Sequence, residues 1–222
     1  SRLIPAHHGS HHGSSPLITA PPPAAPPPEY APRDAARMRA AAGIISRNGA
    51  SNVFTTQVMG GYGAGTMHLY ANFESMSHSM EVSANMMGDP AWAALNAERE
   101  KGPSAVVVGP DLSRLIAGAP NRGNTAMMVR EYEMPRTNLM TAAGMMADAQ
   151  KMSEPHGVNV TMWAPVISSE MNRAFVVYSA ADMVALGHGV DNVGMSEEFQ
   201  AMVTEASKLG TLTRSFGMVI FR

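Results

Sequence analysis

A stretch near residue 50 recurs near residue 160, and this repeat constrains the fold more than any other feature of the sequence. Asn52-Val53 matches Asn159-Val160 at an offset of 107 residues. The same offset carries Ser75-Met76 onto Asp182-Met183, Asp89-Pro90-Ala91-Trp92 onto Ser196-Glu197-Glu198-Phe199, and Ser104 onto Thr211. One offset that holds at four separate places without a gap is the pattern that a duplication leaves.

The second copy has the clearer pattern of elements. Strand-like alternation covers residues 125–134, 158–167, 173–180 and 214–221, and helical periodicity covers 135–151 and 183–208. The glycines of Gly187-His188-Gly189 predict a break in the last helix, and Ser196 is expected to restart it. The order β-α-β-β-α-β is that of a ferredoxin-like unit.

The first copy shows the same order without a clear opening strand. Helices are expected over 33–47 and 76–101, the second one broken near Gly88-Asp89-Pro90, and strands over 52–59, 66–73 and 104–108. The opening strand should fall within 18–32, which contains Pro21–Pro23 and Pro26–Pro28. Proline cannot donate to a strand ladder. Either residues 17–20 supply a short edge strand, or the edge is open and invites pairing with another chain.

Bulk composition excludes several classes of protein. The net charge is −2 and only 15% of the 222 residues are charged, so we expect no nucleic-acid partner. No apolar run reaches the 18 residues of a transmembrane helix. Cysteine is absent, which removes disulfides, thiolate metal sites and a cysteine nucleophile. No signal peptide is visible, which favours the cytoplasm.

Methionine is unusually frequent, with 20 residues and adjacent pairs such as Met86-Met87 and Met145-Met146. Two interpretations compete. Methionine fills irregular gaps in cores, and its thioether also binds Cu(I). Repeated Met-x-x-Met spacing in a loop is lacking, so we favour core filling.

The segment from Gly88 to Arg99, which reads GDPAWAALNAER, is similar to a helix of NIPSNAP-like and antibiotic-biosynthesis-monooxygenase-like proteins. Together with the tandem units, it resembles the dimeric α/β-barrel superfamily over roughly residues 33–222. The resemblance implies two sheets that close a barrel with helices outside. In some members small ligands or haem occupy the space between sheet and helices, and other members have no known activity.

These observations combine into one expected architecture. We predict an α+β fold in which two tandem ferredoxin-like β-α-β-β-α-β units pack as a pseudo-dimeric α/β barrel. Residues 1–32 form an extended arm rich in His, Gly, Ser and Pro. Residues 33–120 form the first unit, whose first strand is missing or short, and residues 121–222 form the second.

Four residues are candidates for a ligand site. His68 and Tyr70 share one face of their strand because side chains alternate with a period of two. Trp163 lies across the second hairpin from Tyr178, and the position of His68 is taken there by Phe175. A pocket lined by His68, Tyr70, Trp163 and Tyr178 would suit an aromatic or quinone-like ligand. The alternative is that the aromatics are core and His68 is a partly exposed strand residue.

No metal or cofactor site is predicted. Weak candidates for metal ligands are two adjacent pairs of histidines in the arm, His7-His8 and His11-His12. No His-x-x-x-His pair and no set of His and carboxylate residues with ligand spacing occurs. Glycines of residues 60–65 lie between two strands, which indicates a hairpin turn and not a phosphate-binding loop.

Three classes of function follow. We favour a non-catalytic structural or assembly subunit that attaches to partner chains through the N-terminal arm and a sheet edge, as a homo-oligomer or part of a larger assembly. The alternative is a cofactor-free monooxygenase or small aromatic-ligand-binding protein of the dimeric α/β-barrel type, as the resemblance allows. A metal or haem protein that uses His or Met residues of the tail is the third.

Overall fold

The computed structural model describes residues 17–18, 31–102, 107 and 109–221. Its strands form one antiparallel sheet in the order β1-β4-β6-β7-β5-β8-β2-β3. The strands are β1 (Leu17–Ile18), β2 (Asn52–Gly61), β3 (Met67–Asn72), β4 (Asp111–Ala117), β5 (Ala126–Glu133), β6 (Asn159–Ile167), β7 (Arg173–Ala180) and β8 (Thr211–Phe221).

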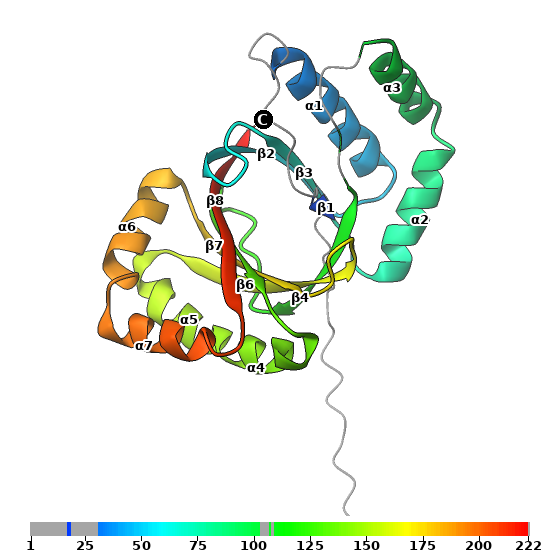
Figure 1. Ribbon diagram of the computed structural model, residues 1–222. Coiled ribbons are helices and arrows are strands. Elements are labelled where there is room, and N and C mark those ends of the chain that lie inside the picture. Colours follow the sequence, from blue (N-terminus) through cyan, green and yellow to red (C-terminus); the bar gives the residue numbers. More distant parts are fainter. Residues whose placement is uncertain (1–16, 19–30, 103–106, 108, 222) are drawn as a thin grey trace, which may run out of the picture.

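The sheet curls until its two end strands meet. Strand β8 pairs with both β5 and β2, and β4 pairs with both β6 and β1. At the two ends of the order, β1 lies beside β3, so the wall runs almost completely round a barrel (Figure 1). The predicted α+β class with a curled antiparallel sheet is therefore confirmed.

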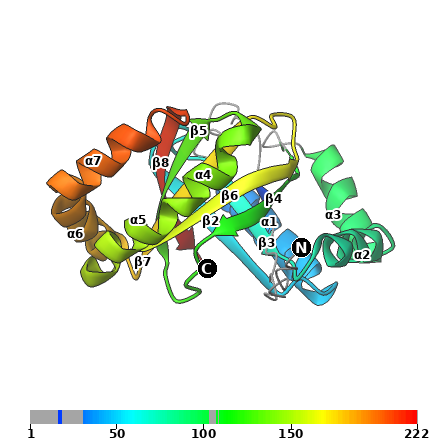
Figure 2. The same cartoon turned by 90° about the horizontal axis from the view of Figure 1, so that it is seen from below.

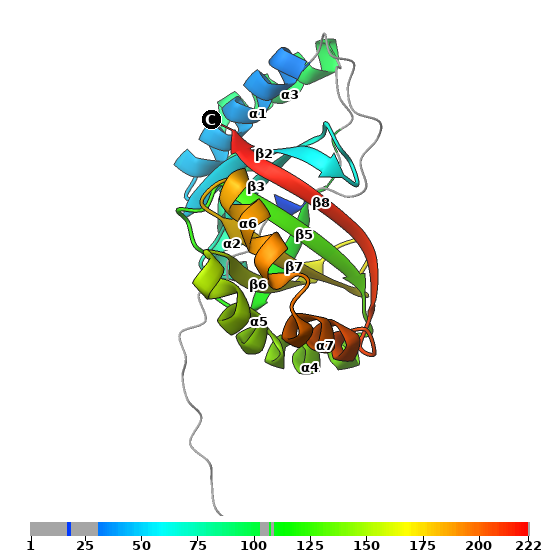
Figure 3. The same cartoon turned by 90° about the vertical axis from the view of Figure 1, so that its left-hand side faces the viewer.

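Helices cover the outside of the barrel in two groups (Figures 1 and 2). The first group is α1 (Ala31–Arg47), α2 (Met76–Met87) and α3 (Pro90–Lys101). The second group is α4 (Leu139–Gly144), α5 (Met146–Ser153), α6 (Met183–Val193) and α7 (Glu197–Ala206), with 3-10 turns at η1 (Arg136–Asn138) and η2 (Glu154–His156). Figure 3 shows β8 exposed between the two groups.

Four helices begin at the residues that the repeat predicts. Ser75 and Asp89 are the N-caps of α2 and α3, and Asp182 and Ser196 are the N-caps of α6 and α7. Each side chain accepts a hydrogen bond from a backbone N–H of the first turn, which satisfies one of the free donors there. The cap positions of the two groups are thus separated by the same 107 residues.

The two hairpins also share one register at this offset. Thr56 lies opposite His68 in the β2–β3 hairpin. Trp163 lies opposite Phe175 in the β6–β7 hairpin. A slip of one residue would turn every side chain to the other face, so the shared register places equivalent side chains on equivalent faces.

The predicted break at Gly187-His188-Gly189 is wrong, because α6 runs through all three residues. A Cβ atom at Gly189 would lie only 2.1 Å from Cγ2 of Val158. The glycine therefore allows α6 to pack closely on the chain that leads into β6. The break falls instead at residues 194–196, before α7.

Two predictions about the first copy need qualification. The predicted strand at 104–108 falls mostly outside the described residues, and the closing strand is β4, which begins seven residues further along. An opening strand does exist as the two-residue β1, which pairs with β4. Residues 1–16 and 19–30 of the predicted arm lie outside the described part of the chain, and its last two residues, 31–32, belong to α1.

The core has separate inner and outer layers. An inner cluster fills part of the barrel and consists of Val58, Tyr70, Met127, Val129, Trp163, Phe175, Phe216 and Met218. Two outer clusters pack the sheet against α1 and α2 and against α4–α7. Alternation along each strand sends one set of side chains to each layer.

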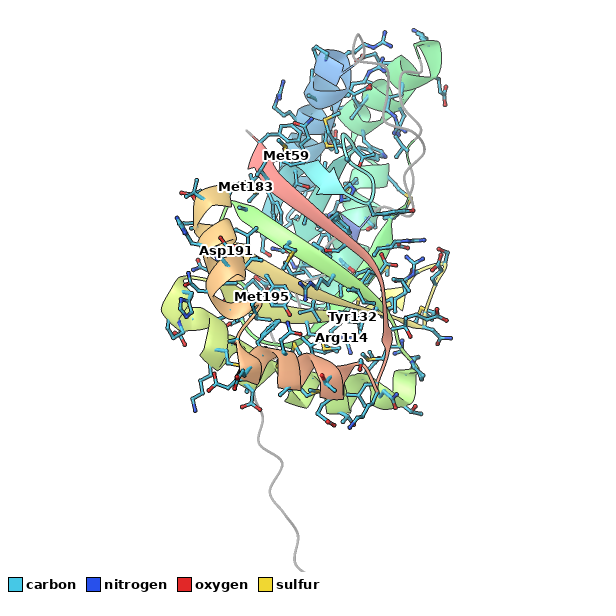
Figure 4. All side chains as sticks on the ribbon, turned by 60° about the vertical axis from the view of Figure 1, so that its left-hand side comes forward. Met59, Arg114, Tyr132, Met183, Asp191 and Met195 are labelled. Atoms are coloured by element: carbon cyan, nitrogen blue, oxygen red, sulfur yellow. The ribbon has the colours of Figure 1, made fainter. Side chains whose placement is uncertain are left out.

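Methionines contribute to the core only in part. Met127, Met162 and Met218 are buried, as core filling predicts, whereas Met87 and Met195 are 77% and 82% exposed. Figure 4 shows Met183, Asp191 and Met195 on the outer surface at α6 and the turn that follows it.

Candidate functional site

A cavity of about 430 Å³ lies inside the barrel. Its middle is aromatic and apolar, and the rings that line it are Phe54, Tyr70, Trp163, Phe175 and Phe216. The rings of Phe54 and Tyr70 stack with their centroids 5.2 Å apart. The volume is within the range of small-molecule sites, and the lining suits a flat apolar ligand.

Strand periodicity positions one face of β3 toward this cavity. His68, Tyr70 and Asn72 alternate along the strand and line the cavity. The intervening Leu69 and Ala71 pack outward against the helices. The offset of 107 residues carries His68 and Tyr70 onto Phe175 and Val177, which also line the cavity, so only one side of the barrel has the polar pair.

His68 and Tyr70 are buried and hydrogen-bonded to each other. His68 Nδ1 lies 3.1 Å from the Tyr70 hydroxyl, and the side chains are only 8% and 4% exposed. Burial removes water from both groups, which lowers the pKa of His68 to about 4 and raises the pKa of Tyr70. Both groups are therefore neutral at physiological pH.

The neighbours of His68 indicate its tautomer. The Thr66 hydroxyl donates to the Gly63 carbonyl at 2.7 Å and lies 3.4 Å from His68 Nε2. Because its proton is used, Thr66 offers His68 a lone pair, which favours a proton on Nε2. Nδ1 is then an acceptor for the Tyr70 hydroxyl. The other acceptor near that hydroxyl is the thioether sulfur of Met218 at 3.5 Å, a weak one.

Charged side chains gather at one end of the cavity. Glu131 Oε1 lies 2.8 Å from Arg173 Nη1 and 3.3 Å from Arg214 Nη1, and all three residues line the cavity. Arg173 also pairs with Glu170, and the Arg214 guanidinium lies 4.4 Å from the centroid of the Tyr62 ring. These residues were missed in the sequence, because each is a single charge in an otherwise ordinary strand.

Three of the four predicted site residues line the cavity, namely His68, Tyr70 and Trp163. The indole N–H of Trp163 donates to Thr161 at 3.0 Å. Tyr178 lies on the opposite face of β7 and packs among the outer residues, edge to face with Phe199. Its burial raises its pKa to about 12. The cavity is therefore in the barrel interior, and not between sheet and helices as the resemblance implied for some members.

The other histidines that the structure describes, His78, His156 and His188, do not line the cavity. His156 and His188 are exposed, and the His pairs at residues 7–8 and 11–12 lie outside the described residues. Within the described ranges, no three His, Cys, Asp or Glu side chains cluster as metal ligands. The helices of the same ranges include none long and apolar enough to cross a membrane.

The chain matches no protein-family model and no curated protein. Among solved structures it is similar to an anthrone oxidase-like protein, with a TM-score of 0.63 and 9% identity over 97% of this chain and 93% of that chain. It is also similar to a candidate monooxygenase from Lactobacillus acidophilus NCFM, with a TM-score of 0.56 and 10% identity over 94% of this chain and 92% of that chain. A third similar structure is a variant of chlorite dismutase from Candidatus Nitrospira defluvii, with a TM-score of 0.52 and 9% identity over 96% of this chain and 93% of that chain.

These similarities confirm the fold, which is a ferredoxin-like α+β barrel. They also contradict the favoured prediction of a non-catalytic assembly subunit, because the neighbours carry the names of enzymes. That prediction relied on an apparent lack of any site. The strand pattern had located His68 and Tyr70 on one face, but it could not show that this face closes on a cavity.

Proposed function

We propose that this protein is a cofactor-free oxygenase that acts on a small, flat aromatic ketone or phenol inside the barrel. The observation that carries the proposal is the neutral, hydrogen-bonded pair of His68 and Tyr70 in an aromatic cavity of about 430 Å³. The likeness to an anthrone oxidase-like protein and to a candidate monooxygenase supports this chemistry. It is the alternative function that the sequence suggested.

The aromatic rings provide binding and the buried pair provides acid–base chemistry. A fused-ring substrate gains stacking with rings such as Phe54 and Trp163. Neutral His68 has a lone pair available on Nδ1, and Tyr70 bridges between that lone pair and the cavity. As the Tyr70 oxygen accepts a proton from the substrate, its own proton moves to His68 Nδ1.

The reaction balances with molecular oxygen as the sole oxidant. The His68–Tyr70 pair removes one proton from an activated CH₂ group, and the resulting carbanion is stabilised by the conjugated ketone. The carbanion adds O₂, and return of the proton gives a hydroperoxide. Loss of water then leaves a new C=O group, so CH₂ and O₂ become C=O and H₂O. A buried imidazolium is unfavourable alone, but the substrate anion beside it offsets that cost.

Some members of the superfamily that this chain resembles hold haem between sheet and helices. In the second half of this chain, that space has no room for haem. Buried apolar side chains fill it, including Met162, Tyr178, Leu186 and Phe199. The histidines of this half, His156 and His188, are exposed. The absence of any cofactor stays a prediction.

The tandem organisation is part of the same proposal. We infer that residues 33–120 and 121–222 are duplicated ferredoxin-like units that pack as a pseudo-dimer. The shared hairpin register and the four N-caps at one offset support this. The duplication then left the polar pair in one unit, while Phe175 and Val177 stand in the other. Assembly of the whole chain as a homo-oligomer also stays a prediction, which light scattering would test.

The test is oxygen uptake with anthrone as the substrate. We expect the protein to consume one O₂ per anthrone and to form anthraquinone, measured with an oxygen electrode and by absorbance, above the rate without protein. His68→Gln and Tyr70→Phe are each expected to lower this rate by about 100-fold or more, the usual contribution of a positioned acid–base group. His188→Gln is the matched control, because His188 is exposed on α6.

Two results would overturn the oxygenase proposal. One is a wild-type rate equal to that of anthrone alone. The other is full activity in the His68→Gln variant. If the protein binds anthrone but takes up no oxygen, its function is the binding of aromatic ligands and not their oxidation.

A further inference from the structure

Neutral polar side chains gather at one end of the cavity, separate from the His68–Tyr70 pair. Asn52 lies opposite Asn72 in one hairpin, and Asn159 lies opposite Ser179 in the other. All four line the cavity, together with Asn124, whose amide donates to the Ser179 hydroxyl at 3.0 Å. The repeat thus contributes one polar pair from each half of the chain.

Strand pairing shows that the two polar pairs occupy the same end of the barrel. The last residues of β8 lie beside the first half of β2 on one side and beside Ala126 on the other. Ala126 in turn lies opposite Ala180, which follows Ser179. The charged cluster of Glu131 and Arg214 lies toward the other end of β8. The cavity therefore has a charged end, an aromatic middle and an end lined by amide and hydroxyl side chains, here called the amide end.

Asn72 is the residue that points to a ligand. Its side chain is only 9% exposed and lines the cavity, yet its amide makes no hydrogen bond with any described residue. Because no described residue uses its donors or its acceptor, they are available to water or to a ligand group in the cavity. Asn159 differs, because its amide already donates to the Ala119 carbonyl at 2.9 Å.

We propose that the amide end is a recognition site for an uncharged hydroxyl or carbonyl group at the end of a fused-ring aromatic ligand. Amides and hydroxyls each offer both a donor and an acceptor, which matches a phenol or a ketone. The charged side chains of this end, Arg39 and Arg122, are exposed at its outer rim. The inference rests on the proposed function, since it names the substrate class of the same cavity.

The test measures binding of three inert quinones, so it does not depend on turnover. The probes are anthraquinone, 2-hydroxyanthraquinone and anthraquinone-2-carboxylate, at a mildly acidic pH at which the phenol is neutral. The chain has two tryptophans, and Trp92→Phe leaves Trp163 in the cavity as the sole reporter of quenching. In that background we expect the hydroxy compound to bind about 5- to 10-fold more tightly than anthraquinone, the value of one added hydrogen bond.

Asn72→Leu is expected to abolish this preference and leave the affinity for anthraquinone within about 2-fold. Asn72→Ala provides the same comparison if leucine disturbs folding, and Asn85→Leu on the exposed face of α2 is the control. The proposal is overturned if the preference survives in both Asn72 variants, if the carboxylate binds most tightly, or if no quinone binds. If the protein prefers the hydroxy compound but takes up no oxygen with anthrone, the proposed amide site is supported and the proposed oxygenase function is rejected.

Discussion

Acidification should destabilise this protein through the buried side chain of His68. The folded pKa of about 4 lies below the unfolded value of 6.5, because burial disfavours the charged ring. Above about pH 6.5 the ring is neutral in both states and has no effect. Below it, the unfolded chain binds a proton that the folded chain excludes, so stability falls with pH until about pH 4, where the folded state binds it too.

The size of this effect follows from the pKa difference. At about 1.4 kcal/mol per pKa unit, lowering the pH from about 7.5 to about 4.5 should reduce the free energy of unfolding by roughly 2.5 kcal/mol through this one group. His68→Gln removes the titration. The decrease in the free energy of unfolding between the two pH values should therefore be smaller in that variant by roughly 2.5 kcal/mol.

Urea unfolding followed by tryptophan fluorescence measures the difference directly. Wild type, His68→Gln and the exposed-site control His188→Gln are compared at both pH values, so that all other titrating groups cancel. Wild type and the control should lose stability in parallel. The reasoning is refuted if His68→Gln loses as much stability as wild type, or if NMR titration places the pKa of His68 near 6.5.

Two further predictions concern the framework around the cavity. Ser75→Ala and Ser196→Ala should each lower the free energy of unfolding by about 1 kcal/mol, since each hydroxyl caps a helix; equal stability of both variants and wild type in urea would contradict the cap assignment. Glu131→Gln should cost about 3 kcal/mol, because it leaves Arg173 and Arg214 without their buried carboxylate. A loss below about 1 kcal/mol, measured the same way, would show that water already compensates these guanidinium groups.

Local signals in the sequence predicted much of this framework. Ser75, Asp89, Asp182 and Ser196 were recognisable as caps because a short polar side chain before an apolar run has a specific hydrogen-bonding role at a helix start. The repeat also predicted that the second hairpin would copy the first. Strand alternation placed His68 on the face of Tyr70, which the structure confirms.

Features that depend on packing between distant elements could not be predicted in this way. Two glycines around His188 indicate a break, yet α6 continues because Gly189 fits against Val158. Tyr178 was grouped with Trp163, although the alternation of β7 turns it to the helices and leaves Phe175 and Val177 inside. Which face of a strand becomes the interior is decided only when the sheet closes.

The central claim is tested most directly by isotope labelling of the oxidation. Protein treated with a chelator, and free of flavin and haem absorbance, is mixed with anthrone under ¹⁸O₂, and the product is examined by mass spectrometry. The account predicts one ¹⁸O atom in the new carbonyl group of anthraquinone, formed by wild type and not above background by His68→Gln. Unlabelled product, or activity that disappears with the chelator, would contradict it.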